Sequence, residues 1–209
     1  MAMLIFDLDG TLIDSNGVWV EVDKTFLARR GAPYTKAYYE GVAHTILQNC
    51  AVFTKEYLGL SESCEEIIAE WMDLAAGQYH HVPLKPGVRA YLDRCRSAGH
   101  RMAVFTACVP EHCQAAMEAH GLGEYFEQVI YAQKLGEDKR SPAIFKHVAN
   151  LLGVAPRECV FFDDSLSACK AAKAADMTVV GVYDPFFHDS RADLRELCDQ
   201  FIESFEDLL

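Results

Sequence analysis

Residues 4–14 read Leu-Ile-Phe-Asp-Leu-Asp-Gly-Thr-Leu-Ile-Asp, and this stretch predicts the first strand of the fold and the beginning of a site. The apolar run from Met3 to Phe6 is typical of a buried strand. Asp7 and Asp9 follow at its end, where a period of two points both side chains to the same side. Gly10 then allows the backbone to turn or to approach a ligand closely.

Two carboxylates that lie close together repel each other, so they need a cation, a shared proton or full solvation. A hard divalent ion fits best, because Mg²⁺ prefers oxygen ligands and is commonly held by one or two carboxylates and a substrate phosphate. The alternative is structural, since Asp9 or Thr11 could cap a helix that begins near Thr11. The stretch alone leaves both interpretations open.

The composition limits the size of the core, the partners and the location that we expect for this protein. The chain has 209 residues, of which 51% are hydrophobic, which is enough for one buried core and a smaller lobe. A net charge of -12 argues against a nucleic-acid surface and offers no basic stripe to a membrane. The eight cysteines show no Cys-x-x-Cys spacing, and no secretory signal or membrane-spanning run is indicated. We therefore expect a cytoplasmic protein with reduced thiols and no nucleic-acid or membrane partner.

The rest of the chain changes pattern twice. Apolar residues recur at helical spacing between about residues 18 and 81, where no strand is indicated. Beyond residue 83, the expected strands are 102–105, 129–131, 159–162, 178–182 and a short edge strand near 201, and the expected helices are 88–98, 111–120, 142–152, 165–175 and 192–197. This order predicts an α/β fold in which residues 1–15 and 83–209 form a doubly wound, Rossmann-like parallel sheet core. Residues 16–82 are expected to form a small inserted all-helical cap domain.

Polar side chains follow several of these strands. Asp7 and Asp9 follow the first strand, Thr106 follows the second, and Asp163 and Asp164 follow the fourth. Because doubly wound folds bind ligands outside the carboxyl ends of their strands, we expect these residues to converge at one edge of the sheet. A second acidic pair at that edge makes metal binding a better interpretation than helix capping.

The motifs resemble those of a known family. Asp7-Leu-Asp-Gly-Thr-Leu12 resembles the first signature of the haloacid dehalogenase-like hydrolases, a superfamily made up mostly of phosphatases. The resemblance implies that Asp7 is a nucleophile and that Asp9 is a general acid and base. Val104-Phe-Thr106-Ala resembles the second motif, in which the hydroxyl group and the following amide bind phosphoryl oxygens.

Two further motifs come in the family's order. Lys139-Arg-Ser-Pro-Ala-Ile-Phe145 resembles the third motif, usually Lys-Pro-x-Pro, with an arginine in place of the first proline. Lys134 is a competing candidate for its lysine. Val160-Phe-Phe-Asp-Asp-Ser165 resembles the fourth motif. Asp164 matches the family's metal ligand there, and Asp163 matches the accompanying acid, which acts through a water molecule or a lysine contact.

The resemblance implies a chemistry for the whole chain. The helical insert is similar to the cap of the phosphoglycolate phosphatase and β-phosphoglucomutase branch. The implied activity is Mg²⁺-dependent hydrolysis of a small phosphomonoester through an aspartyl-phosphate on Asp7, with Asp9 protonating the leaving oxygen. Lys139 and Thr106 would hold the phosphoryl oxygens, and Asp7, the backbone carbonyl of Asp9 and Asp164 would hold Mg²⁺.

Two other functions stay open. β-Phosphoglucomutases carry a histidine about ten residues after the second aspartate and an arginine in the cap, where this chain has Trp19 and His44, so hydrolysis is preferred to mutase-like phosphoryl transfer. A non-catalytic sensor of a phosphorylated ligand is the other alternative, but the chain retains every acid that catalysis needs. His44 and Gln48 are hypothesised to face the substrate, which the sequence limits only to a small phosphorylated metabolite.

Overall fold

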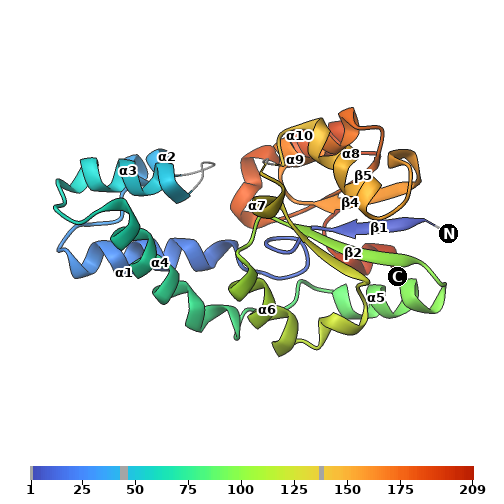
Figure 1. The fold of residues 1–209 in the computed structure, drawn as a ribbon, viewed down its shortest axis with the longest axis horizontal. Coiled ribbons are helices and arrows are strands. Elements are labelled where there is room, and N and C mark those ends of the chain that lie inside the picture. The colour runs from blue at the N-terminus through green and yellow to red at the C-terminus, as the bar shows by residue number, and fades with distance from the viewer. Residues whose placement is uncertain (1, 43–46, 137–138) are drawn as a thin grey trace. The chain divides into compact units, whose positions relative to one another are not determined.

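The computed structural model describes residues 2–42, 47–136 and 139–209 and divides into two compact units, Met1–Asn16 with His81–Leu209, and Gly17–His80. The larger unit contains one parallel sheet with the strand order β3-β2-β1-β4-β5-β6 (Figure 1). Its strands are β1 Met3–Phe6, β2 Arg101–Thr106, β3 Gln128–Tyr131, β4 Cys159–Asp163, β5 Thr178–Val182 and β6 Gln200–Ile202. The predicted doubly wound sheet with an inserted helical segment is confirmed.

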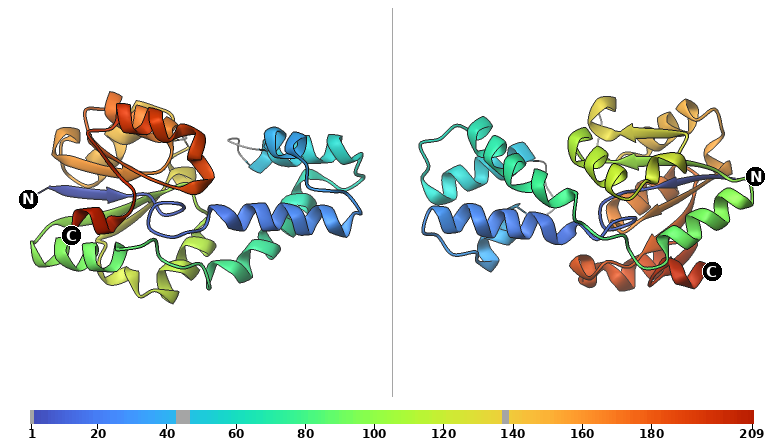
Figure 2. Two further views of the ribbon diagram at one scale, coloured as in Figure 1. Left: turned by 180° about the vertical axis from the view of Figure 1, so that it is seen from behind. Right: turned by 90° about the horizontal axis from the view of Figure 1, so that it is seen from below.

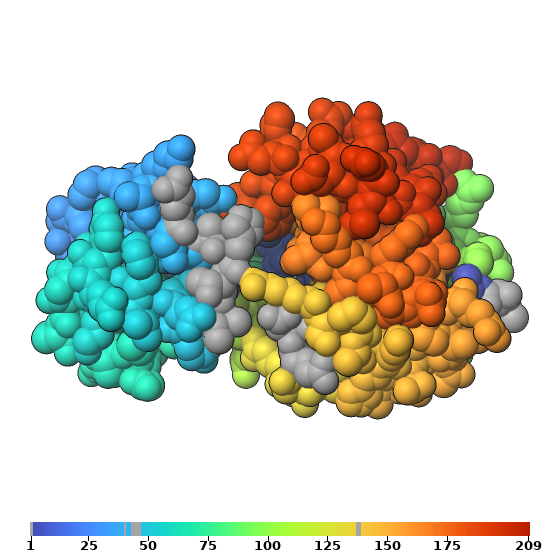
Figure 3. All heavy atoms as spheres, turned by 90° about the horizontal axis from the view of Figure 1, so that it is seen from above, coloured from blue at the N-terminus to red at the C-terminus, as the bar shows by residue number. Residues whose placement is uncertain are grey.

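Helices cover both faces of this sheet. Figure 1 shows α5 and α6 on one side of the strands and α8, α9 and α10 on the other. Their bounds are α5 Val88–Ser97, α6 Pro110–Ala119, α7 Ala132–Leu135, α8 Pro142–Leu151, α9 Leu166–Ala174 and α10 Arg191–Leu197. In the space-filling view of Figure 3, the segments from α8 to α10, yellow-orange to red, form a continuous surface over their side of the unit.

Successive residues of the central strands face opposite layers, as the period of two requires. On one face, the ring of Phe6 stacks on Phe162 at 4.6 Å, and both rings contact Phe205. On the other face, Phe161 packs edge-on against Phe145 of α8. The aromatic layer of the first face brings the C-terminal turn Phe205–Leu208 beside α5, and both views of Figure 2 show this proximity. The central strands are therefore buried on both faces, which fixes the positions of their carboxyl ends.

The smaller unit is entirely helical among its described residues. It contains α1, which begins at the boundary, and three further helices, with the bounds α1 Asn16–Arg29, α2 Lys36–Val42, α3 Leu47–Leu58 and α4 Cys64–Tyr79. Phe26 of α1 packs on Trp71 of α4, and both side chains are buried, as the helical spacing of apolar residues predicts. None of the helices in the described part of the chain is both long and apolar enough to cross a membrane. The roles of catalytic core and cap for the two units stay a prediction.

A polar cluster lies inside the smaller unit. The hydroxyl group of the fully buried Tyr38 donates to Asp23 Oδ1 at 3.3 Å and lies 2.9 Å from the hydroxyl of Thr54. Burial raises the pKa of Asp23 to about 7, although the bond from Tyr38 opposes this rise. The folded unit therefore favours the protonated form of Asp23 at pH values where the unfolded chain has already ionised it.

Asp23→Asn is expected to stabilise the protein at pH 8 and to change its stability little at pH 4. The pKa of Asp23 is higher in the folded state. The stability that its protonated carboxyl group contributes is therefore fully present below about pH 4 and is lost as the pH rises toward 7. We expect a gain of about 1–2 kcal/mol in the free energy of unfolding at pH 8, because partial exposure reduces the full effect of the shift. Urea denaturation at both pH values measures it. Asp73→Asn, at an exposed position of α4, is the control and should give no pH-dependent difference.

Candidate active site

The site forms where the central strands end. Phe6 pairs with Val104 of β2 and with Phe162 of β4, so the residues after all three positions lie side by side. The backbone N–H of Asp7 continues the ladder by donating to the Phe162 carbonyl at 2.9 Å. The parallel register therefore brings Asp7, the end of β2 and the acidic pair of β4 to one edge of the sheet.

Three acids meet at this edge. Oxygen atoms of Asp7, Asp163 and Asp164 all lie within 4.8 Å of one another, and the three residues are 6%, 1% and 3% exposed. Burial raises the pKa of Asp7 to about 7, while the charge of Lys139 opposes that rise. Burial and the charges of Asp163, Asp7 and Asp184 also raise the pKa of Asp164. Such a set of hard oxygen donors with excess negative charge fits Mg²⁺, which would relieve the repulsion.

Lys139 joins two of these acids. Its Nζ donates to Asp7 Oδ1 and to Asp163 Oδ2, each at 2.6 Å, and to the Phe105 carbonyl at 3.2 Å. The two carboxylates raise the pKa of Lys139 although burial opposes them, so the lysine stays charged. The competing candidate, Lys134, is exposed and lies 5.0 Å from the centre of the Tyr131 ring. The structure thus places Lys139 beside the predicted nucleophile.

The turn after β1 supports the acids. Asn16 Nδ2 donates to Asp164 Oδ2 at 2.8 Å, and Ser15 Oγ donates to Asp9 Oδ1 at 2.5 Å. Gly10 adopts a positive φ of 79°, and a Cβ atom at this position would clash with Asp164 Oδ2 and with Asn16 Nδ2. No helix begins at residue 11, since the next one starts at Asn16, so the helix-capping alternative for Asp9 and Thr11 is wrong.

Gly10→Ala is expected to reduce the phosphoryl-transfer activity that the motifs imply by at least about 100-fold, because the methyl group must displace Asp164. Gly153→Ala is a matched control, since Gly153 also has a positive φ, 69°, but has open space where its Cβ would lie. Both variants carry the same backbone penalty of about 1 kcal/mol, and only Gly10→Ala has the clash. Turnover of an aryl phosphate by the two variants separates the effects. Equal turnover would show that Gly10 matters only for its backbone conformation.

Thr106 lies at the end of β2 and is fully buried. Its Oγ1 accepts the backbone N–H of Cys108 at 2.9 Å, which fixes the side chain and leaves the hydroxyl hydrogen to be donated elsewhere. The carbonyl group of the next residue, Ala107, accepts a bond from Gln133 Nε2 at 3.2 Å. The loop after β2 is thus held at both residues that the resemblance assigns to phosphoryl binding.

The structure bears on the predicted roles of Asp163 and Asp9 and adds two residues to the site. The side chain of Asp163 contacts Lys139 and accepts the Ser165 N–H at 2.7 Å, which agrees with the predicted lysine contact. The metal-binding role of the Asp9 carbonyl stays a prediction. Asn16 and Ser15 were not predicted, although both directly follow the first motif and carry donors suited to carboxylates.

His44 and Gln48 are the two residues of the helical insert that were expected to face the substrate. His44 lies outside the described residues. Gln48 lies in α3 and is exposed. A role for either residue toward a substrate stays a prediction.

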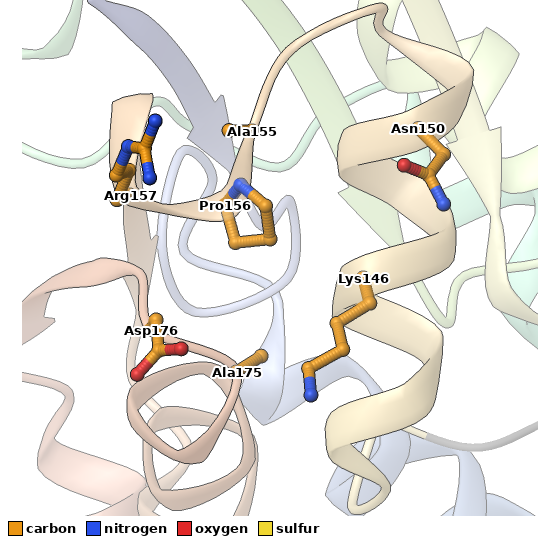
Figure 4. Close-up of a pocket in the computed structure, with 7 residues that line it drawn as sticks. All are labelled: Lys146, Asn150, Ala155, Pro156, Arg157, Ala175 and Asp176. Atoms are coloured by element: carbon orange, nitrogen blue, oxygen red, sulfur yellow. The ribbon is translucent and has the colours of Figure 1, made fainter.

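A hollow of about 540 Å³ lies away from this site (Figure 4). Lys146 and Asn150 project from α8 toward it, and Arg157 and Asp176 belong to the segments that lead into β4 and β5. It therefore lies at the amino ends of those strands, opposite the acids. The residues just named are all exposed, so the hollow is a feature of the surface.

Sequence comparison identifies relatives. The family model for haloacid dehalogenase-like hydrolases matches residues 4–182. A phosphoglycolate phosphatase from Pseudomonas putida is 30% identical over 89% of this chain and 71% of its own length. A phosphorylated carbohydrates phosphatase from Thermotoga maritima is 25% identical over 84% of this chain and 82% of its own length.

Solved structures share the fold. CbbY from Rhodobacter sphaeroides, in complex with xylulose-(1,5)bisphosphate, matches with a TM-score of 0.82 and 21% identity over 100% of this chain and 96% of its own. A β-phosphoglucomutase from Clostridium difficile matches with a TM-score of 0.79 and 18% identity over 100% and 93%. The family match and the phosphatase relatives agree with the chemistry of the acids at the sheet edge. The chain belongs to the haloacid dehalogenase-like hydrolases and is an enzyme of their phosphatase type.

Proposed function

We propose that this protein is a Mg²⁺-dependent phosphatase that hydrolyses a small phosphomonoester through an aspartyl-phosphate on Asp7. The observation that carries the proposal is the contact of Lys139 with both Asp7 and Asp163, at 2.6 Å each, within a cluster of three buried acids. A purely structural role does not account for this cluster, since buried carboxylates in excess of their cations are costly.

The nucleophile is held in one orientation. Lys139 occupies Oδ1 of Asp7, which leaves Oδ2 to attack phosphorus and displace the leaving oxygen. The Thr106 hydroxyl would bind an oxygen of the transferred group, and Lys139 would bind another by exchanging one of its three present bonds for it. Both groups would stabilise the charge that develops on these oxygens. Mg²⁺, held by Asp7, the Asp9 carbonyl and Asp164, would reduce the repulsion between the carboxylate and the phosphate dianion.

Asp9 would carry the proton. The Ser15 hydroxyl donates to Oδ1 of Asp9 and holds the carboxyl group in place, and the protonated carboxyl group would give its proton to the leaving alcohol oxygen. The Asp9 carboxylate would then take a proton from the water that attacks the aspartyl-phosphate, and phosphate would leave with Asp7 restored. These two steps need no acid or base other than Asp9.

The relatives favour a small metabolite as the substrate. They include a phosphoglycolate phosphatase and a phosphorylated carbohydrates phosphatase, so we infer a phosphorylated hydroxy acid or sugar of similar size for this chain. We infer a cytoplasmic location from the eight cysteines, which are all free thiols and suit a reducing compartment.

Hydrolysis of an aryl phosphate with and without Mg²⁺ tests the proposal. We expect turnover that disappears with a chelator and returns with added Mg²⁺, and a panel of phosphorylated hydroxy acids and sugars then identifies the preferred ester. Isomerisation of a sugar phosphate without release of phosphate would instead establish a mutase. Mg²⁺ binding without turnover of any ester would establish a sensor of phosphorylated ligands.

A further inference from the structure

A second buried ion pair lies at the same edge of the sheet. Lys85 Nζ is 2.7 Å from Asp184 Oδ2, and the side chains are only 7% and 2% exposed. Lysine is rarely buried, and a buried ion pair stabilises a fold no better than apolar side chains of similar size. A contribution to stability therefore does not explain why this chain places two charges here.

The pair adjoins the acids on two sides. Asp184 lies two residues beyond β5, whose Gly181 pairs with Asp163 of β4. The backbone N–H of Lys85 donates to the Leu12 carbonyl at 3.0 Å, in the turn whose Gly10 packs against Asp164. The second oxygen of Asp184 accepts the Phe186 N–H at 2.8 Å, so the position of its charge is fixed.

The charges at this edge leave a defined excess. Buried acids and their lysine partners contribute four negative and two positive formal charges, from Asp7, Asp163, Asp164, Asp184, Lys85 and Lys139. The balance of these buried groups is two negative charges, to which the half-buried Asp9 adds, so the edge favours a divalent cation. Removing Lys85 alone would leave three negative charges, and removing the charge of Asp184 alone would leave one.

We propose that Lys85 and Asp184 are positioning residues that set the charge around Asp164 and thereby the affinity of the site for Mg²⁺. The inference rests on the proposed function, because it needs a metal at the acids. The negative charge of Asp184 acts on Asp164, and Lys85 offsets that charge. The pair thus acts on the metal through the electrostatic field and not as a ligand.

The two single substitutions should change metal affinity in opposite directions. Asp184→Asn leaves the charge of Lys85 uncompensated and should weaken Mg²⁺ binding, whereas Lys85→Met leaves the charge of Asp184 uncompensated and should strengthen it. We expect the dissociation constants of the two variants to differ by at least about tenfold at low ionic strength. The double variant should lie between them. Calorimetric titration of the metal-free proteins with Mg²⁺ measures all three without relying on turnover.

A structural role predicts a different pattern. If the pair only holds the backbone, both single variants should weaken Mg²⁺ binding to a similar extent. Dissociation constants within threefold of each other, or a double variant that binds more weakly than Asp184→Asn, would overturn the proposal. Arg96→Met, which breaks an exposed ion pair of 2.8 Å with Glu124, is the control and should leave the affinity unchanged.

Two measurements keep the outcomes distinct. Circular dichroism identifies the variants that fold. If Lys85→Met does not fold, the proposal still requires the double variant to bind Mg²⁺ several-fold more tightly than Asp184→Asn. A wild-type protein that binds no Mg²⁺ would refute the proposed function. A wild-type protein that binds Mg²⁺ and hydrolyses esters, with variants that fail the comparison, would refute this inference alone.

Discussion

Asp7→Asn will lower the turnover of an aryl phosphate by at least about 10⁴-fold, because an amide oxygen cannot serve as the nucleophile that forms the aspartyl-phosphate. The substitution keeps the shape of the side chain and an oxygen that can accept the bond from Lys139. It also removes one of the crowded buried charges, so the variant should remain folded. Steady-state kinetics with Mg²⁺ present measure the loss, and mass spectrometry of the quenched reaction should find a phosphoryl group on Asp7 of the wild type only.

The matched control is Asp14→Asn. Asp14 ends the same first stretch but its side chain is exposed, and it should keep turnover within about twofold of the wild type. If Asp7→Asn retained turnover while remaining folded, the acid cluster would have to act without a covalent intermediate.

Lys139→Met is expected to reduce both activity and stability. The variant loses the cation that contacts Asp7 and Asp163, so it keeps their buried charges without a lysine partner. Breaking such a buried pair costs about 3–5 kcal/mol, and the loss of one donor to the transferred group should reduce kcat by about 10²–10³-fold. Part of the lost stability should return when Mg²⁺ is added. Chemical denaturation with and without Mg²⁺, together with steady-state kinetics, measures both effects.

Lys134→Met provides the comparison for this experiment. Its exposed side chain contacts the face of Tyr131 and not the acids, so we expect nearly unchanged kinetics and stability. The opposite result, with activity lost on replacing Lys134 and kept on replacing Lys139, would mean that the other lysine serves the third motif.

Local patterns in the sequence were sufficient for the sheet. The apolar runs that end in Asp7 and Asp163 became neighbouring parallel strands, because a strand buried on both faces must be apolar along its length. Turns and helix ends were also predictable, since glycine and proline act through their own backbones. The edge at which the predicted polar residues gather follows from the parallel direction of the strands.

Contacts between distant segments could not be predicted from local patterns in the sequence. Lys139 and Lys134 could not be separated by spacing alone, and the choice is made by a contact with Asp7 across 132 positions of the chain. Lys85 and Asp184 are 99 positions apart and match no motif, so neither showed a signal in the sequence.

The sequence by itself therefore determined the fold class, the family resemblance and the residues from which a phosphoryl-transfer site could be built, because strand periodicity and motif order are local properties. Only the tertiary structure decided which lysine meets the acids, that Asn16 and Ser15 orient Asp164 and Asp9, and that a second ion pair shares their edge. Those contacts depend on how the strands and the turns between them pack in three dimensions, where a charge acts on whatever lies near it regardless of its distance along the chain.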